Sequence, residues 1–122
     1  MGSLKVFFRL IFLSLILLSL YFSLIPASQS VPVFWNDKLV HCVSYFFLTL
    51  ALDFSWGTGE KLLIKGCLIF LYSSMIEFGQ SFVPGRDMSI EDIAANTIGI
   101  LMFIILVPMF KKINAYQLLL LK

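Results

Sequence analysis

The sequence predicts an all-α integral membrane protein, an antiparallel bundle of four transmembrane helices. Hydrophobic residues make up 60% of the 122 residues and charged residues 13%, about half the charged fraction that is usual in water-soluble domains. The mean hydropathy is +0.97, and the apolar residues come in blocks about as long as a bilayer is thick. At this length we expect one membrane domain that covers residues 1–122.

The first two apolar blocks each have a recognisable start or stop signal. The first covers about 6–25 and is stopped by Pro26 and the polar residues after it, which is one full span. The second covers about 39–56. It opens at Asn36-Asp37, which are helix-capping residues, and it ends at the glycines that begin with Gly57.

The last two blocks complete the bundle. The third covers about 62–82 and halts at Pro84-Gly85, and the fourth covers about 90–110, from just after Ser89 to Lys111-Lys112. Connections of about five to thirteen residues make neighbouring spans antiparallel, so we expect an up-and-down bundle.

The Lys and Arg residues predict the orientation of the bundle, because basic residues accumulate in cytoplasmic loops. If both termini are cytoplasmic, that side carries seven basic residues: Lys5, Arg9, Lys61, Lys65, Lys111, Lys112 and Lys122. The opposite side carries Lys38 and Arg86. The acidic residues divide the other way, with Asp37, Glu77, Asp87, Glu91 and Asp92 at the outer end and Asp53 and Glu60 at the inner end.

A cleaved signal peptide is the competing interpretation of the first block, because Lys5 and Arg9 precede it and small residues follow Pro26. Its apolar stretch exceeds the roughly 7–15 residues of a signal h-region, which favours a retained span. The basic residues are scattered and the formal net charge is +2, so we expect no nucleic-acid partner. Cys42 and Cys67 fall on the order of 20 Å apart along neighbouring spans, beyond disulfide reach.

Polar side chains inside the spans gather at one depth. His41 lies about one turn into the second span, Glu77 and Gln80 lie in the last two turns of the third, and Asn96 lies about one turn into the fourth. In antiparallel helices these positions come level near the outer surface. Polar or small residues also share a face on each of the last three spans: Asp37, His41, Tyr45 and Thr49; Gly66, Ser73, Glu77 and Gln80; Asp92, Asn96 and Gly99. We expect these faces to pack inward, since ionisable groups facing hydrocarbon are costly.

Each polar residue also has a purely structural interpretation. Ser89 and Asp92 form a capping-box-like pair, and Asn36 or Asp37 would cap the second span. Asn96 and Gln80 would hydrogen-bond between helices. Arg86 and Lys38 would be anchors beside lipid head groups, and Asp53 would be wetted at the inner end. Glu77 and His41 are the strongest functional candidates, because intramembrane ionisable residues are rare and most often functional.

The ordered set of these motifs resembles the VanZ-like family of bacterial membrane proteins, named after an accessory component of teicoplanin resistance. The runs that carry the resemblance are Asp37-Lys38-Leu39-Val40-His41, Glu77-Phe78-Gly79-Gln80, Pro84-Gly85-Arg86, and Asp92 with Asn96 and Gly99. The resemblance covers about residues 33–107.

The resemblance implies a cell-envelope role in the bacterial plasma membrane. Carried over residue by residue, it marks Asp37, Lys38, His41, Glu77, Gln80, Pro84, Gly85, Arg86, Asp92 and Asn96. The family pattern is not followed after Arg86, where the chain continues with Asp87-Met88. The negative charge of Asp87 next to the guanidinium of Arg86 would weaken an anion site built there.

The leading functional hypothesis is binding of an amphiphile, such as a lipid-linked cell-wall intermediate or a glycopeptide with a fatty tail. Arg86 and Lys38 would contact phosphate or carboxylate, while Glu77, Gln80 and Asn96 would hydrogen-bond sugar or peptide groups. Membrane lipids and a second copy of the chain are the other expected partners.

The alternative is an intramembrane enzyme acting on a lipid head group, with Glu77 or His41 as acid–base residue. We expect neither a cofactor nor a metal, because one histidine without metal-ligand spacing is a weak site even with Glu77 and Asp92. A proton path is the weakest hypothesis, since the inner halves of the spans offer only Asp53 and a few hydroxyls to continue a proton relay.

Overall fold

A computed structural model of the chain describes residues 2–29 and 36–110. Within this part, helices α1, α2, α3 and α4 cover Gly2–Leu24, Asp37–Ser55, Leu62–Gln80 and Ile90–Phe110, and a 3₁₀ turn, η1, covers Ala27–Gln29. The described residues contain no strand, and these four helices are each long and apolar enough to cross a membrane. The predicted all-α class with four membrane-spanning helices is therefore confirmed. Lys111, Lys112 and Lys122 lie outside the described residues.

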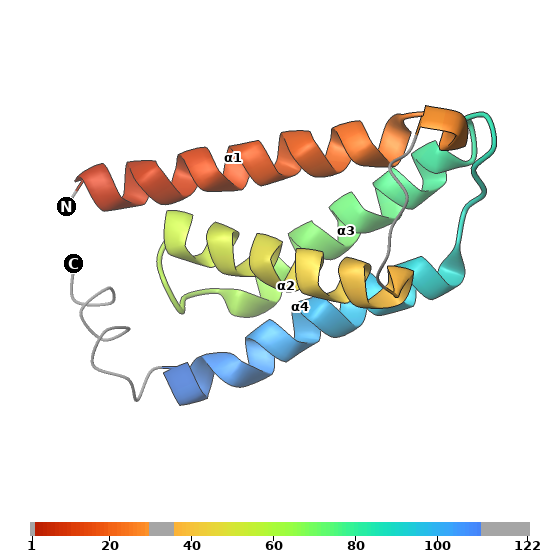
Figure 1. Cartoon of the computed structure of the whole chain (residues 1–122). Helices are drawn as coiled ribbons and strands as arrows, with labels where there is room; N and C mark the ends of the chain where they lie inside the picture. Colours follow the sequence, from red (N-terminus) through yellow and green to blue (C-terminus); the bar gives the residue numbers. More distant parts are fainter. Residues whose placement is uncertain (1, 30–35, 111–122) are drawn as a thin grey trace.

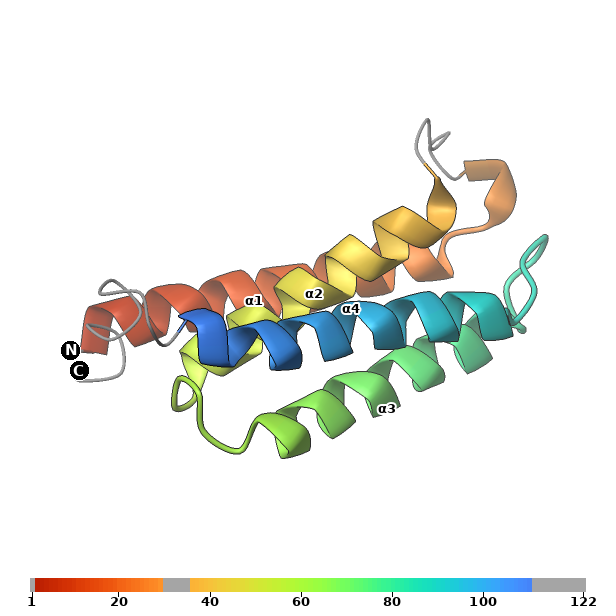
Figure 2. The ribbon, with the colours of Figure 1, turned by 90° about the horizontal axis from the view of Figure 1, so that it is seen from below.

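The helices run alternately up and down the bundle (Figures 1 and 2). We call the end where α1 and α3 finish and α2 and α4 begin the site end, and the end where α1 begins and α4 finishes the terminal end. Helix α2 packs against each of the other three, and α3 also packs against α1 and α4. The most central helix is therefore α2, which carries His41.

The buried core joins these helices through apolar side chains. Leu48, Ile69 and Ile100 are buried together from α2, α3 and α4, and Phe103 and Val107 are fully buried lower on α4. Helix α1 has no fully buried residue, and most of its large apolar side chains are exposed in the isolated chain. That pattern is expected of a peripheral helix whose outer face meets lipid.

Helices α2 and α4 approach each other most closely at Gly99. A Cβ atom built there would overlap the carbonyl oxygen of Cys42 and lie 3.1 Å from the backbone nitrogen of Phe46. A glycine on one membrane helix lets the backbone of the next come into direct contact. Gly99 therefore sets the α2–α4 distance near the site end.

The sequence predicted that the Asp53 side chain is in contact with water, and the structure shows it buried. Its side chain is 0% exposed and forms a salt bridge with Lys65, Nζ to Oδ1 2.6 Å. The turn between α2 and α3 folds over the pair: the Gly59 N–H donates to both Asp53 oxygens, and Lys65 donates to the Gly57 carbonyl at 2.7 Å. Both glycines have positive φ, which allows this tight turn. The expectation was wrong because distance from the helix end does not reveal how a loop folds back.

Gly99→Ala tests the contact between α2 and α4. We expect it to lower the free energy of unfolding in detergent micelles by about 1–3 kcal/mol, because the added methyl group overpacks two backbones. Gly79→Ala is the matched control, since its Cβ would meet Leu24 Cδ2 at an ordinary 3.6 Å. Equal stability of the two variants would contradict the close approach.

Asp53→Asn tests the buried ion pair at the terminal end. It leaves the ammonium of Lys65 buried without its counter-charge, and we expect a loss of about 3–5 kcal/mol in the free energy of unfolding. The double variant Asp53→Asn, Lys65→Met removes both charges and should recover part of that loss. A single variant as stable as the exposed control Lys61→Ala would show that the pair is not desolvated.

Candidate functional site

The two helices that begin at the site end are capped by their own sequence. The Asn36 side chain accepts a hydrogen bond from the Lys38 N–H at 2.9 Å, and the Ser89 hydroxyl accepts one from the Asp92 N–H at 3.2 Å. These bonds satisfy free backbone donors at the starts of α2 and α4. The capping interpretation thus applies to Asn36 and Ser89, and it leaves the Asp37 and Asp92 carboxylates available for other contacts.

Lys38 lies among carboxylates from both helices. Its ammonium forms a short contact with Asp92 Oδ1 and lies 3.6 Å from Glu91 Oε2 and 3.8 Å from Asp37 Oδ2. An ammonium in such surroundings has its charge already offset. Lys38 is therefore a poorer partner for a phosphate than the sequence predicted.

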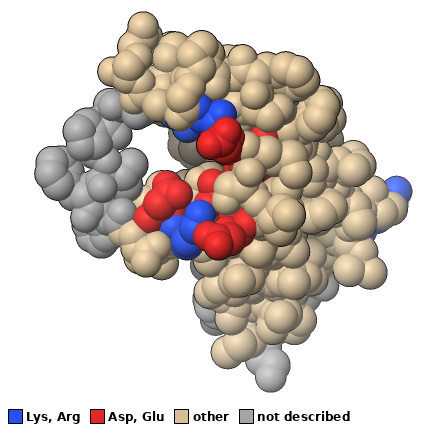
Figure 3. Space-filling view, turned by 90° about the vertical axis from the view of Figure 1, so that its right-hand side faces the viewer, with Lys and Arg blue, Asp and Glu red and all other residues tan. Residues whose placement is uncertain are grey.

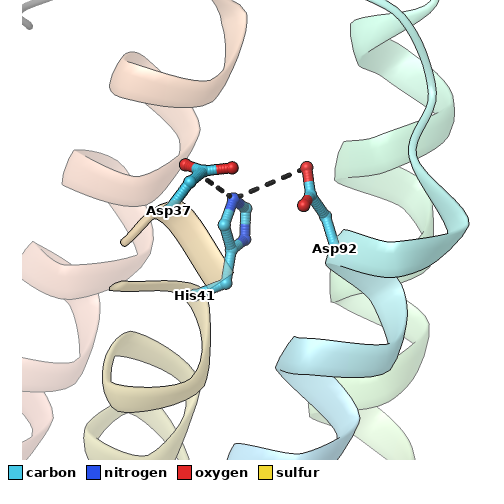
Figure 4. A group of neighbouring side chains, drawn as sticks. All are labelled: Asp37, His41 and Asp92. Atoms are coloured by element: carbon cyan, nitrogen blue, oxygen red, sulfur yellow. Dashed lines mark ion pairs between the residues drawn. The ribbon is translucent and has the colours of Figure 1, made fainter. Parts of the chain in front are cut away.

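His41 lies between two of the same carboxylates (Figure 4). Its Nε2 is 3.8 Å from Asp37 Oδ1 and 3.7 Å from Asp92 Oδ2. One ligand atom from each of Asp37, His41 and Asp92 can be chosen so that all lie within 4.8 Å of one another, the spacing of a group that could hold a metal ion. The ammonium of Lys38 contacts the carboxylates of both Asp37 and Asp92 and so adds a positive charge beside this group.

Asn96 connects three helices. Its Oδ1 lies 2.9 Å from His41 Nδ1, and its Nδ2 donates to Ser73 Oγ on α3 at 2.8 Å. Because the amide oxygen can only accept, the imidazole carries its proton on Nδ1 in this arrangement. In the neutral ring the Nε2 lone pair then faces the carboxylates of Asp37 and Asp92.

Glu77 is buried at the last turns of α3, with 1% of its surface exposed. Its Oε2 accepts a hydrogen bond from the Ser89 N–H at 3.3 Å. Its Oε1 is buried and has no hydrogen-bond partner among the described residues. A buried carboxyl oxygen without a partner is costly, which makes Glu77 the least satisfied polar group at the site end.

Gln80 and Arg86 reach across to α1. Gln80 Nε2 donates to the Ser23 carbonyl at 3.1 Å. Arg86 donates through Nε to the Ile25 carbonyl at 2.8 Å and through a terminal nitrogen to the Phe22 carbonyl at 3.1 Å. The guanidinium therefore caps free carbonyls at the end of α1, and these two bonds use two of its five N–H groups.

A cavity of about 540 Å³ opens between α1, α2 and α3 at the site end, within the usual size range of ligand pockets. Viewed onto this end, acidic and basic side chains gather around a recess (Figure 3). The cavity is lined by Leu15, Leu18, Ser19, Phe22, Ser23, Ile25, Asp37, Val40, His41, Val43, Ser44, Tyr45, Phe47, Leu48, Ile76, Glu77, Gln80 and Arg86.

The predicted site residues divide into two groups. Asp37, His41, Glu77, Gln80 and Arg86 line the cavity. The others, Lys38, Asp92 and Asn96, lie in the contact between α2 and α4, where Asn96 holds His41 and Asp92 holds Lys38. The second group therefore does not line the cavity and instead holds Lys38 and His41 of α2 against α4.

Sequence reasoning missed the contribution of α1, which it took as the least distinctive span. This helix supplies apolar cavity walls such as Leu18 and Phe22 and the carbonyls that hold Gln80 and Arg86. The one available signal was the pair Ser19 and Ser23, four residues apart on one face. It also missed that Asp37 and His41, at the same spacing, form a potential metal-binding group with Asp92.

Four long apolar helices, three of which enclose a cavity with one polar end, define a small multi-pass membrane protein. A family model described as VanZ/LLP1 matches residues 8–111. The chain belongs to this VanZ-like family, as the motifs in its last three spans predicted.

One similar protein comes from a fungus. The chain is 34% identical over 106 residues to "Uncharacterized protein C11E3.10" of Schizosaccharomyces pombe, a match that covers 84% of this chain and 63% of the yeast protein. The chain thus spans less than two thirds of that relative. No solved structure matches the present chain.

Asn96→Ala tests the three-helix connection. It leaves His41 Nδ1–H and the Ser73 hydroxyl without their partner, and we expect the free energy of unfolding to fall by about 1–3 kcal/mol. Nitrogen-15 NMR of His41 should show loss of the Nδ1–H tautomer. Thr97→Ala is the control, because that hydroxyl bonds Ile93 O within its own helix; matching results for both variants would contradict the role of Asn96.

Proposed function

We propose that this protein binds a membrane amphiphile, with the tail of the amphiphile in the cavity between α1, α2 and α3 and its head group at the site end. The single observation that carries the proposal is the composition of the cavity wall. Charged and amide groups line one end, and apolar side chains such as Leu15, Val43 and Phe47 line the rest. A concave apolar wall with a few convergent polar groups is typical of a ligand site.

The exposure of the wall supports entry from the membrane. Leu18 and Phe22 on α1 and Val43 and Phe47 on α2 line the cavity and are also about half exposed. In a bilayer these side chains meet lipid, so a lipid tail reaches the cavity without crossing water. The cavity forms within one chain, and a second copy is not needed to build its walls.

Arg86 is the cation best placed to meet an anionic head group. It lines the cavity, and a guanidinium keeps further donors after bonding two carbonyls. Lys38, by contrast, is engaged by Asp92, Glu91 and Asp37. The proposal therefore assigns the phosphate or carboxylate contact to Arg86.

Lipid-linked cell-wall intermediates and fatty glycopeptides belong to this ligand class, and the second would provide a link to glycopeptide resistance. Similarity to a yeast protein favours a more general membrane lipid, because yeast makes no peptidoglycan. The resemblance to bacterial family members supports a bacterial plasma membrane, and the distribution of basic residues supports cytoplasmic termini, with the site on the opposite face. A topology reporter that placed the loop at Arg86 in the cytoplasm would reverse this orientation.

Acid–base catalysis by Glu77 and His41 is less well supported. His41 is engaged by Asn96 on one ring nitrogen and faces Asp37 and Asp92 with the other, while one oxygen of Glu77 accepts from Ser89. Each group thus has its own partners from other elements. This arrangement favours a binding site over a proton-transfer pair.

Native mass spectrometry of the purified protein tests the proposal. We expect a lipid to remain bound, and Ser44→Trp to lower the bound fraction about tenfold, because the indole fills a cavity-lining position. Ser14→Trp, on the exposed face of α1, is the matched control. Absence of bound lipid, or equal retention in both variants, would overturn the proposal.

A further inference from the structure

Head-group contacts decide which lipid this cavity selects. A lipid tail that moves from the bilayer into the cavity exchanges one apolar environment for another, so the tail itself gains little. This inference rests on the proposed lipid-binding function and asks which head group the polar end of the cavity accepts.

Hydrogen-bond acceptors and negative charge dominate that polar end. Glu77 offers a buried oxygen without a partner among the described residues, and Asp37 offers a carboxylate at the rim. The amide nitrogen of Gln80 is already used by the Ser23 carbonyl. Arg86 is the cationic donor on the cavity wall. The carboxyl oxygens of Glu77 and Asp37 therefore call for a hydrogen-bond donor on the ligand.

The surroundings add further negative charge. Asp92 and Glu91 lie beside Lys38 just behind the cavity wall, so that ammonium cannot also neutralise the carboxyl groups that line the cavity. A purely anionic head group would place its charge next to the carboxylate of Asp37, which is repulsive at the rim of a site of low dielectric. One phosphate, held by Arg86, is the negative charge that the site accommodates.

We propose that the ligand is an aminophospholipid whose phosphate binds Arg86 and whose primary ammonium binds the carboxyl group of Glu77, which lines the cavity, with Asp37 nearby at the rim. A primary ammonium carries N–H donors that a trimethylated one lacks. The site therefore distinguishes an ethanolamine head group from choline by hydrogen bonding. It distinguishes the same head group from glycerol phosphate lipids by charge.

The test uses the full-length protein in nanodiscs that contain equal amounts of dioleoyl phosphatidylethanolamine, phosphatidylcholine and phosphatidylglycerol. Lipid that remains bound is then identified by native mass spectrometry. We expect the ethanolamine lipid to exceed each of the others by about tenfold, the effect of one good charge-assisted hydrogen bond. Glu77→Gln should bring the ratios near unity while lipid is still retained.

Two further variants separate this contact from general charge. Asp37→Asn changes an exposed rim carboxylate, should fold normally, and should reduce the ethanolamine preference in part. Glu60→Gln removes an exposed charge at the terminal end and should leave the preference unchanged. Comparison of the lipids on the unmodified protein keeps the test decisive even if Glu77→Gln fails to fold.

The outcomes distinguish this inference from the proposed function. Equal retention of the three lipids, or preference for phosphatidylglycerol, would overturn the aminophospholipid inference while the cavity still binds lipid. Retention of no lipid would overturn both. Preference for the ethanolamine lipid that Glu77→Gln and Asp37→Asn leave intact would also overturn the assigned contacts.

Discussion

The contact between α2 and α4 at Gly99 determines the geometry of the whole site end. At this point the α4 backbone lies against the carbonyl of Cys42, leaving no room for a side chain. The close approach lets short side chains span the two helices, so that His41 meets Asn96 and Lys38 meets Asp92. Asn96 then extends the connection to Ser73 on α3. The cavity can be rimmed by polar groups because this network holds them from behind.

The two ends of the bundle accommodate their charges differently. At the terminal end, Asp53 and Lys65 neutralise each other and the α2–α3 turn closes over them. At the site end, Glu77 lines the cavity and keeps a buried oxygen that has no hydrogen-bond partner in the described part of the chain. A buried pair with all its bonds made is a structural feature, whereas an unmet acceptor beside a cavity indicates a ligand. This contrast supports placing function at the site end.

Much of this arrangement could be predicted from the sequence. Apolar block length and helix stop signals gave the four helices, and the depth of polar residues in antiparallel spans brought His41, Glu77 and Asn96 to the same end. What the sequence could not supply was lateral packing. The first span carries few polar residues, and beyond the pair Ser19 and Ser23 nothing indicated that its carbonyls hold Arg86 and Gln80. The burial of Asp53 depends on how the glycine turn after α2 folds, which hydrophobic periodicity does not predict.

Thiol cross-linking between α2 and α4 tests the central contact most directly. Cys42 Sγ lies 3.8 Å from Met102 Sδ, so Met102→Cys in a Cys67→Ser background should let a short bifunctional maleimide join the two thiols within one chain in the membrane. Leu101→Cys lies at the same depth on a different face of α4 and should not. We expect efficient cross-linking within single chains for Met102→Cys alone. Equal yields for both variants, or cross-links only between chains, would contradict the contact between α2 and α4 at this depth.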